Sequence, residues 1–353
     1  MGSRFRKVFS AGSLAVAVCS TLLAMTAGAP SVAQAAASAC NRACLEGFVD
    51  KYLAAMVAHD PARLPKTANV KFTENGQTLK LGDALWGTAE GLGDYKLYFA
   101  DPTAGQIGFF GTVRESGRLA LLALRLKVEK NRISEIETVV ARAQGAAPGG
   151  GGASASGGAG ANAATGQGNN GPGSNPSASR FADMKAQPIF NEALAADDHP
   201  SREELVRIAN SYFEGLEQET GRLTPFDPNC TRIENGSITA NNPDSPRPMG
   251  RMTCGQQFDT GFSKFITAVR ERRYPVVDVE RGLVFAQIFF DHAGTVKTVK
   301  MTDGTTMTVP PPFDAPYTFI IDELFKIRNG KITRIEAVLI PVPYGMPSGW
   351  AKK

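Results

Sequence analysis

The sequence predicts an α+β protein with two similar domains, each a strongly curved antiparallel sheet with an N-terminal helix packed on one face. Three observations support this fold class. An apolar stripe with helical spacing occurs twice, an Asn-Gly hairpin signal follows each stripe at the same distance, and long strand-like runs follow each hairpin. With 353 residues, the chain is long enough for two ordinary domains, each with its own core.

The N-terminal helix of each half is predicted from a stripe that repeats at the same offsets. In such a stripe, every apolar residue falls on one face of a helix. Ser201 and Glu204 form a capping-box pattern at the start of the second helix, and Pro65 and Pro225 end the two segments in register. The stripe residues are Leu45, Phe48, Val49, Tyr52, Leu53 and Met56 in the first half and Leu205, Ile208, Ala209, Tyr212, Phe213 and Leu216 in the second.

Strands are predicted after each helix. Asn75-Gly76 and Asn235-Gly236 are strong signals for two-residue hairpins. Alternating or fully apolar runs then predict long strands over 106–115, 119–130 and 131–142 in the first half, and over 282–292, 317–327 and 330–341 in the second. The second half is longer because of insertions around 238–256 and 294–316, and the latter is expected to form an extra hairpin.

The remaining segments set the domain boundaries. Residues 1–36 have a basic start, an apolar run and the small-residue pattern Ala33-Gln34-Ala35, as in a secretory signal peptide, with an uncleaved anchor as the alternative. Residues 146–179 have no large apolar or charged side chain and are expected to be a disordered linker. The domains are therefore expected at 40–145 and 180–353, in a periplasmic or secreted protein. After signal removal we expect no membrane association. A scattered net charge of +4 gives no sign of a nucleic-acid partner.

The cysteines fit an oxidising compartment. Signal removal would leave Cys40, Cys44, Cys230 and Cys254, and an even number favours disulfides over metal ligands. Cys230–Cys254 is the natural long-range pair, and Cys40–Cys44 would staple the start of a helix. A zinc site is the competing interpretation, but the three histidines lack the spacing of zinc ligands. No metal is expected.

The order of elements, with "FTENGQTLKLGDALWGTA" in the first half and "IEAVLIPVPYGMPSGW" in the second, resembles the nuclear-transport-factor-2-like superfamily, and within it secreted SnoaL-like proteins. The resemblance implies two cone-shaped domains, with an apolar cavity in the second that binds a small hydrophobic or aromatic molecule. It also implies a lyase, isomerase or hydrolase without cofactor that works by general acid–base catalysis. The alternative is a non-catalytic module that binds a ligand or a protein partner, including a homodimer formed through the sheet faces.

Three residues are candidates for catalysis. Asp259 lies among apolar and small residues, where burial would make it a base, but it fits a helix N-cap equally well. His292 follows an aspartate at a strand end and is either a general base or part of a solvated turn. Tyr212 lies on the inner face of its helix and is either a hydrogen-bond donor or a core residue with a local partner.

Four residues are candidates for ligand binding. Arg232 and Arg251 flank the Asp259 region and are suited to a carboxylate or phenolate, although lone arginines are more often surface residues. Tyr344 and Trp350 belong to the Pro- and Gly-rich C-terminal segment, where Tyr344 would act as a gate at the cavity mouth. Trp350 would either stack on a flat ligand or fill the core. Glu74 and Glu234 precede the Asn-Gly turns, and their repetition favours a role in the fold.

Overall fold

The computed structural model describes residues 40–142 and 181–350, which belong to one compact unit. The expected signal peptide, at 1–36, and the expected linker, at 146–179, lie outside the described residues. Across the described part of the chain, no helix combines the length and the apolar character needed to cross a bilayer.

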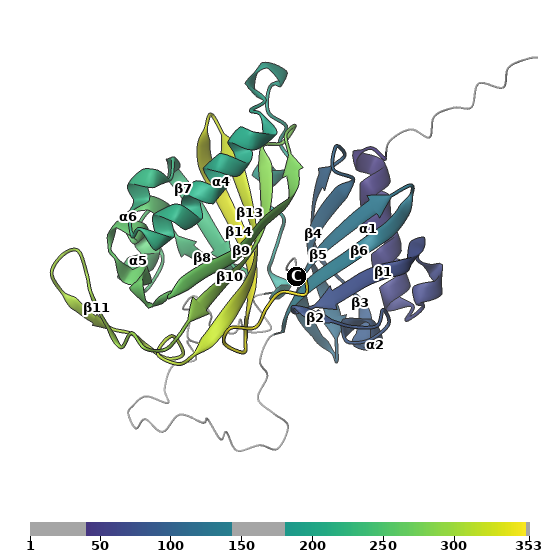
Figure 1. Cartoon of the computed structure of the whole chain (residues 1–353). Coiled ribbons are helices and arrows are strands. Elements are labelled where there is room, and N and C mark those ends of the chain that lie inside the picture. The colour runs from purple at the N-terminus through teal and green to yellow at the C-terminus, as the bar shows by residue number, and fades with distance from the viewer. Residues whose placement is uncertain (1–39, 143–180, 351–353) are drawn as a thin grey trace, which may run out of the picture. The chain divides into compact units, whose positions relative to one another are not determined.

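The described residues contain two six-stranded sheets with the same strand order (Figure 1). The first has the order β2-β1-β6-β5-β4-β3 and the second the order β8-β7-β14-β13-β10-β9. A separate hairpin, β11–β12, forms in the 294–316 insertion, as predicted. The strands are β1 Lys66–Glu74, β2 Gln77–Thr78, β3 Ala89–Asp101, β4 Gln106–Glu115, β5 Arg118–Glu129, β6 Arg132–Arg142, β7 Phe226–Glu234, β8 Ser237–Ala240, β9 Ala268–Asp278, β10 Leu283–His292, β11 Thr298–Lys300, β12 Thr306–Thr308, β13 Tyr317–Arg328 and β14 Lys331–Val342.

Both stripe helices are confirmed. They begin at side-chain caps, because Asn41 accepts a hydrogen bond from the Cys44 N–H and Ser201 accepts one from the Glu204 N–H. Asn75 and Asn235 have positive φ and are followed by glycines of positive φ, the backbone that a tight two-residue hairpin requires. The helices are α1 Arg42–Val57, α2 Leu85–Thr88, α4 Arg202–Glu217, α5 Pro248–Arg251 and α6 Cys254–Asp259, with 3₁₀ turns η1 Pro61–Arg63, η2 Pro188–Phe190, η3 Ala196–Asp198, η4 Gly221–Leu223 and η5 Phe262–Phe265.

The expectation of purely antiparallel sheets is wrong. The strand that leads into each Asn-Gly hairpin pairs in parallel with the last long strand, β1 with β6 and β7 with β14. Hairpin signals report which strands are adjacent in the sequence, whereas a parallel pair joins strands that are far apart along the chain. The fold is therefore mixed α+β, with two mixed sheets.

The pleat of the second sheet divides its side chains between two cores. On β10, Val284, Ala286 and Ile288 join the core beneath α4, while Leu283 and Phe285 join a second core. The alternation follows from the two-residue period of a strand. The side that faces α4 is the one that carries the site described below.

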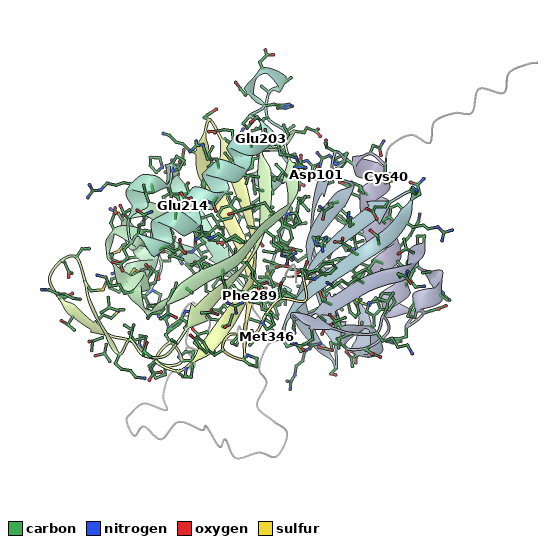
Figure 2. The ribbon with its side chains drawn as sticks, viewed as in Figure 1. Cys40, Asp101, Glu203, Glu214, Phe289 and Met346 are labelled. Carbon is green, nitrogen blue, oxygen red and sulfur yellow. A yellow bond between two sulfur atoms is a disulfide. The ribbon has the colours of Figure 1, made fainter. Side chains whose placement is uncertain are left out.

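The second core is shared by residues of both sheets. It contains Phe99 and Phe110 of the first sheet and Phe285 of the second, with Phe99 and Phe285 ring centroids 5.0 Å apart. Polar contacts join the same two halves: Asp101 of β3, labelled in Figure 2, accepts hydrogen bonds from Arg202 of α4 and from the Val277 N–H of β9. These sheet faces are thus covered within one chain. The homodimer through sheet faces stays a prediction.

The two expected disulfides, Cys40–Cys44 and Cys230–Cys254, are confirmed. Cys230 of β7 and Cys254 at the start of α6 are fully buried, so this bond ties the 238–256 insertion to the sheet. Two disulfides are consistent with an oxidising compartment.

Loss of the longer disulfide is expected to destabilise the protein measurably. The bond closes a loop with a sequence separation of 24, for which the chain-entropy model gives about 3.5 kcal/mol. Urea unfolding of the Cys230→Ala/Cys254→Ala variant should show this loss in the free energy of unfolding. Cys40→Ala/Cys44→Ala is the matched control, with a smaller expected loss because its separation is only 4. Equal losses for both pairs would contradict the loop-length argument.

Candidate functional site

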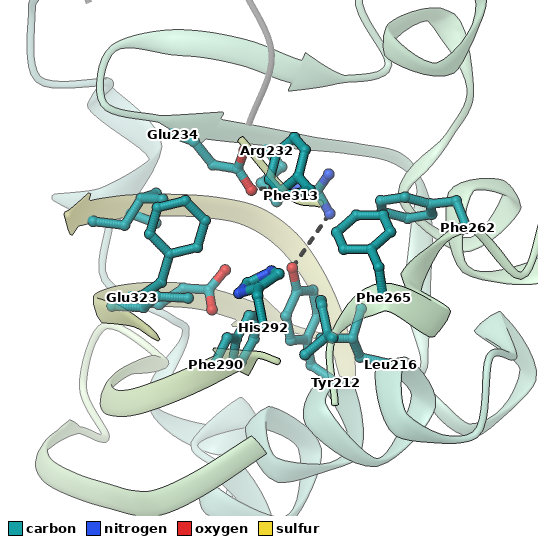
Figure 3. Close-up of a pocket in the computed structure, with 15 residues that line it drawn as sticks. Tyr212, Leu216, Arg232, Glu234, Phe262, Phe265, Phe290, His292, Phe313 and Glu323 are labelled. Atoms are coloured by element: carbon teal, nitrogen blue, oxygen red, sulfur yellow. Dashed lines mark hydrogen bonds and ion pairs between the residues drawn. The ribbon is translucent and has the colours of Figure 1, made fainter. Parts of the chain in front are cut away.

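A pocket opens between α4 and the second sheet (Figure 3). Its empty volume is about 570 Å³, including space that is open to solvent at the mouth. The 3₁₀ turn η5 and the 294–316 insertion contribute aromatic walls, so the pocket is built partly by one of the insertions that lengthen the second half. Its lining is Tyr212, Leu216, Arg232, Glu234, Phe262, Phe265, Ile266, Phe290, His292, Phe313, Phe319, Ile321, Glu323, Ala337 and Leu339.

Strand register places two glutamates on the same face of the sheet beneath this pocket. Glu323 of β13 lies opposite Ala337 of β14, and Ala337 in turn lies opposite Glu234 of β7. Residues opposite one another across neighbouring strands share a face. The methyl side chain of Ala337 leaves room between the two carboxyl groups. A small residue at this position therefore helps to keep the pocket open.

A chain of polar contacts connects these glutamates through a tyrosine and an arginine. Arg232 Nη1 donates to the Tyr212 hydroxyl at 3.2 Å. Tyr212 acts on Glu323 in turn and lowers the pKa of that carboxyl against the larger effect of burial. Arg232 Nε lies 3.0 Å from Glu234 Oε1. Gln257 of α6 accepts a hydrogen bond from Arg232 Nη2 and donates to the carbonyl of Thr239 at 2.6 Å. The guanidinium is therefore fixed in position on several sides.

Burial changes the protonation of the residues in this network of polar contacts. It raises the pKa of Glu323 to about 8, with repulsion from Glu234 adding to the effect, so the Glu323 carboxyl keeps its proton at neutral pH. Burial also raises the pKa of Tyr212 above its usual value. For Arg232, burial alone would lower the pKa, but Tyr212 and Glu234 outweigh it and hold the pKa above its usual value. The site thus combines a neutral acid with a permanent cation.

His292 lies in an aromatic cage at the end of β10. Its ring stacks on Tyr317, with centroids 4.4 Å apart and planes 10° apart, and meets the edge of Phe319 at 5.3 Å. Burial lowers the pKa of His292 to about 4, which the Phe290 carbonyl and Asp291 offset only in part. Nδ1 is buried without a hydrogen-bond partner. The imidazole is therefore neutral at physiological pH.

The structure brings together three of the seven residues predicted for catalysis or ligand binding: Tyr212, Arg232 and His292. The solvated turn considered for His292 is wrong, since the side chain is 1% exposed. The surface position considered for Arg232 is also wrong, because the guanidinium is buried.

Both interpretations of Asp259, a buried base and a helix N-cap, are wrong. Asp259 ends α6, is exposed, and accepts a hydrogen bond from the Gly221 N–H at 2.8 Å. Six apolar or small neighbours in sequence did not bury it, because it lies on the solvent side of a short helix. Arg251 is exposed too, and donates to the Ser245 carbonyl at 2.7 Å. Neither residue lines the pocket.

The C-terminal residues lie elsewhere as well. Tyr344 is 51% exposed and does not line the pocket. Trp350 donates from Nε1 to Thr73 Oγ1 of the first sheet at 2.9 Å, with Lys71 Nζ 4.0 Å from its ring centroid. This tryptophan thus packs against β1 of the first sheet, away from the pocket lining.

Two pocket residues were missed as site candidates. Glu323 is hidden in the run "FIIDELFKI", where its neighbour Asp322 points to the opposite face of the sheet. One signal for Glu323 was available: it is a carboxyl residue at an inward-facing position of a strand, β13, whose residues are buried except for the last. Glu234 was predicted to have only a structural role, because Glu74 occupies the same position before the first Asn-Gly turn. The two glutamates nevertheless have different surroundings.

The matching positions of the first sheet are filled by apolar side chains. By strand register, Leu124 takes the place of Glu323, since it lies opposite Thr138, which lies opposite Glu74. Phe72 takes the place of Arg232, and Phe109 that of Ala286.

A tryptophan also occupies the region of the first half that corresponds to the pocket. Trp86 is fully buried and donates from Nε1 to the Tyr52 hydroxyl at 2.9 Å, so the counterpart of Tyr212 is satisfied locally. Glu74 accepts a hydrogen bond from the Leu85 N–H and pairs with Arg142. The network of polar contacts around Tyr212, Arg232 and Glu234 therefore has no equivalent among the described residues of the first half.

A family model described as a domain of unknown function, DUF8021, matches residues 198–339. This is less than half of the chain, but it encloses every residue that lines the pocket. No match was found among curated proteins. No group of three or more side chains suited to a metal ion occurs in the described ranges.

Several solved structures are similar to parts of the chain. A candidate isomerase from Bacillus subtilis is 12% identical, with 39% of this chain and 86% of that chain covered and a TM-score of 0.26. AusH from Aspergillus nidulans is 13% identical, with 40% and 86% covered and a TM-score of 0.25. A de novo designed protein with a curved β-sheet is 16% identical, with 40% and 88% covered and a TM-score of 0.23. At these TM-scores the likenesses carry no argument about fold or activity.

Proposed function

We propose that the second half of the chain binds a small, largely apolar molecule in this pocket and moves a proton on it without a cofactor, as an isomerase does. The proposal places this chemistry in a nuclear-transport-factor-2-like architecture of an exported protein, as the sequence resemblance implies. The observation that carries it is the pairing of two groups in one apolar pocket: a carboxyl that keeps its proton, Glu323, and a neutral imidazole with an unpartnered nitrogen, His292.

The two groups have complementary roles. With the proton on Nε2, Nδ1 of His292 accepts a proton from a ligand carbon whose anion is conjugated with a carbonyl group, while Glu323 gives its proton to the carbonyl oxygen at the other end of the conjugated system. The resulting enol returns to a ketone when His292 delivers its proton to carbon and Glu323 recovers its own. Atoms and charges balance, and no further reactant is needed. Arg232 and Tyr212 fix the position of Glu323 and stabilise negative charge that develops on the oxygen.

Proton exchange on a simple carbon acid tests the proposal. The full chain is expected to speed the replacement of the α-protons of 2-tetralone by deuterium, followed by proton NMR. Glu323→Gln keeps the shape and the hydrogen-bonding capacity of the side chain but cannot release a proton, and it should slow the exchange by about 10²–10⁴-fold. His292→Phe keeps the aromatic stack and should have a similar effect.

The controls separate chemistry from folding. Glu74→Gln makes the same chemical change at a buried glutamate of the first sheet, outside the pocket, and should leave the exchange rate unchanged. Exchange at the rate of buffer alone, or equal rates in Glu323→Gln and the unchanged chain, would contradict the proposal. In that case, retained binding of 2-tetralone would favour the alternative, a ligand-binding module without catalysis.

A further inference from the structure

The pocket contains two buried polar atoms that nothing in the protein satisfies. Eight buried side-chain atoms in the described residues have no hydrogen-bond partner, and two of them belong to pocket-lining residues: Glu234 Oε2 and His292 Nδ1. An unpaired buried polar atom costs free energy, so native proteins keep few of them. Such atoms at a functional site indicate where a ligand supplies the missing partner.

The two atoms lie at separate positions in the pocket. Glu234 is on β7 and His292 is on β10, and two strands, β14 and β13, lie between them in the sheet. Along β10, His292 is three same-face positions beyond Ala286, the residue that lies in the row of Glu323. Apolar side chains, among them Phe290 and Ile321, line the pocket between them. One small polar group on a ligand cannot reach both atoms.

The surroundings define what each atom requires. Glu234 pairs through Oε1 with Arg232 at 3.0 Å, so Oε2 is a carboxylate oxygen that accepts from a donor. The nearby guanidinium repels a ligand ammonium, which favours a neutral donor. His292 Nδ1 is a donor in one tautomer and an acceptor in the other, and a hydroxyl group serves both.

We infer that the ligand is a largely apolar ring molecule that carries hydroxyl groups at two separated ends, one for Glu234 and one for His292. This inference deepens the proposed function and rests on its pocket, but it concerns ligand class and does not require catalysis. The hydroxyl at Glu234 anchors one end of the ligand and the hydroxyl at His292 the other, and this second hydroxyl leaves Nδ1 free when Nδ1 accepts a proton from carbon.

Binding of matched biphenyls to the full chain tests the inference. The probes are 4,4′-dihydroxybiphenyl, 4-hydroxybiphenyl and 4,4′-dimethoxybiphenyl, which differ in the number of donors on one scaffold. Isothermal titration is expected to show at least tenfold tighter binding of the dihydroxy compound than of the dimethoxy compound, with the monohydroxy compound between them.

A change at Glu234 tests the assigned contact. Glu234→Gln keeps an oxygen for Arg232 and presents an amide N–H₂ in place of Oε2, so the preference for the dihydroxy probe should fall by at least tenfold or reverse. Glu74→Gln, the matching change in the first sheet, should retain the preference. Circular dichroism of each variant checks that the fold is intact.

Each outcome decides the inference. Equal affinities for the three probes, or no binding of any, overturn it and leave water as the partner of the two atoms. A preference that survives Glu234→Gln also overturns the contact. Because binding is measured without turnover, loss of the donor preference with normal α-proton exchange would reject the ligand class alone. A retained donor preference without α-proton exchange would reject the proposed chemistry alone.

Discussion

Arg232→Met is expected to lower the free energy of unfolding by about 3–5 kcal/mol, because it removes one partner of a buried ion pair. Arg232 is 4% exposed, and its guanidinium contacts Tyr212, Gln257 and Glu234. Methionine matches much of its length but leaves the partly buried Glu234 carboxylate without a cation. Urea unfolding of the two proteins at pH 7 measures the difference.

The double variant Arg232→Met/Glu234→Gln separates the loss of charge pairing from the loss of packing. It has no unpaired carboxylate at this position, so most of the lost stability should return. The first sheet supports this expectation, because Phe72 fills the position that matches Arg232 and is itself buried. If the double variant were as unstable as Arg232→Met, packing and not charge would explain the loss.

Much of the fold could be predicted because its signals are local. The stripes of α1 and α4 and the Asn-Gly turns depend on residues a few positions apart, and the structure has helices and turns where these signals lie. The parallel pairing of β1 with β6 and of β7 with β14 could not be predicted in this way. It depends on contacts between residues about 65 to 105 positions apart, which no local pattern reports.

The candidate site was only partly predictable for a similar reason. Tyr212 could be placed because helical spacing fixes the face on which it lies. Asp259 and Glu323 show the difficulty: each is a carboxylate among apolar neighbours, yet Asp259 is exposed and Glu323 is buried. Apolar neighbours in sequence do not bury a side chain in a short helix, whereas both faces of a central strand are covered here.

The free energy of unfolding is expected to fall as the pH rises from 6.5 to 8. Burial raises the pKa of Asp322 and of Glu323 to about 8, and that of Glu336 to about 7. In the unfolded chain these carboxyls have ordinary values near 4, so in this window the folded protein binds more protons than the unfolded one. Stability then decreases with rising pH, by about 1 kcal/mol per pH unit for each carboxyl that remains protonated only in the folded state.

Two buried bases have the opposite sign but contribute mainly at the edges of this window. Burial lowers the pKa of His292 to about 4, so His292 makes stability rise with pH only up to its ordinary value, near 6.5. Burial lowers the pKa of Lys326 to about 8, so its contribution begins near the upper end of the window and grows mainly above it. Urea unfolding at pH 6.5 and pH 8, at constant ionic strength, therefore measures the carboxyls. Glu323→Gln should flatten the dependence by about 1 kcal/mol per pH unit, since an amide does not titrate. Stability that is constant or higher at pH 8 would mean that these carboxyls are ionised in the folded protein, and Glu323 would then have no proton to donate.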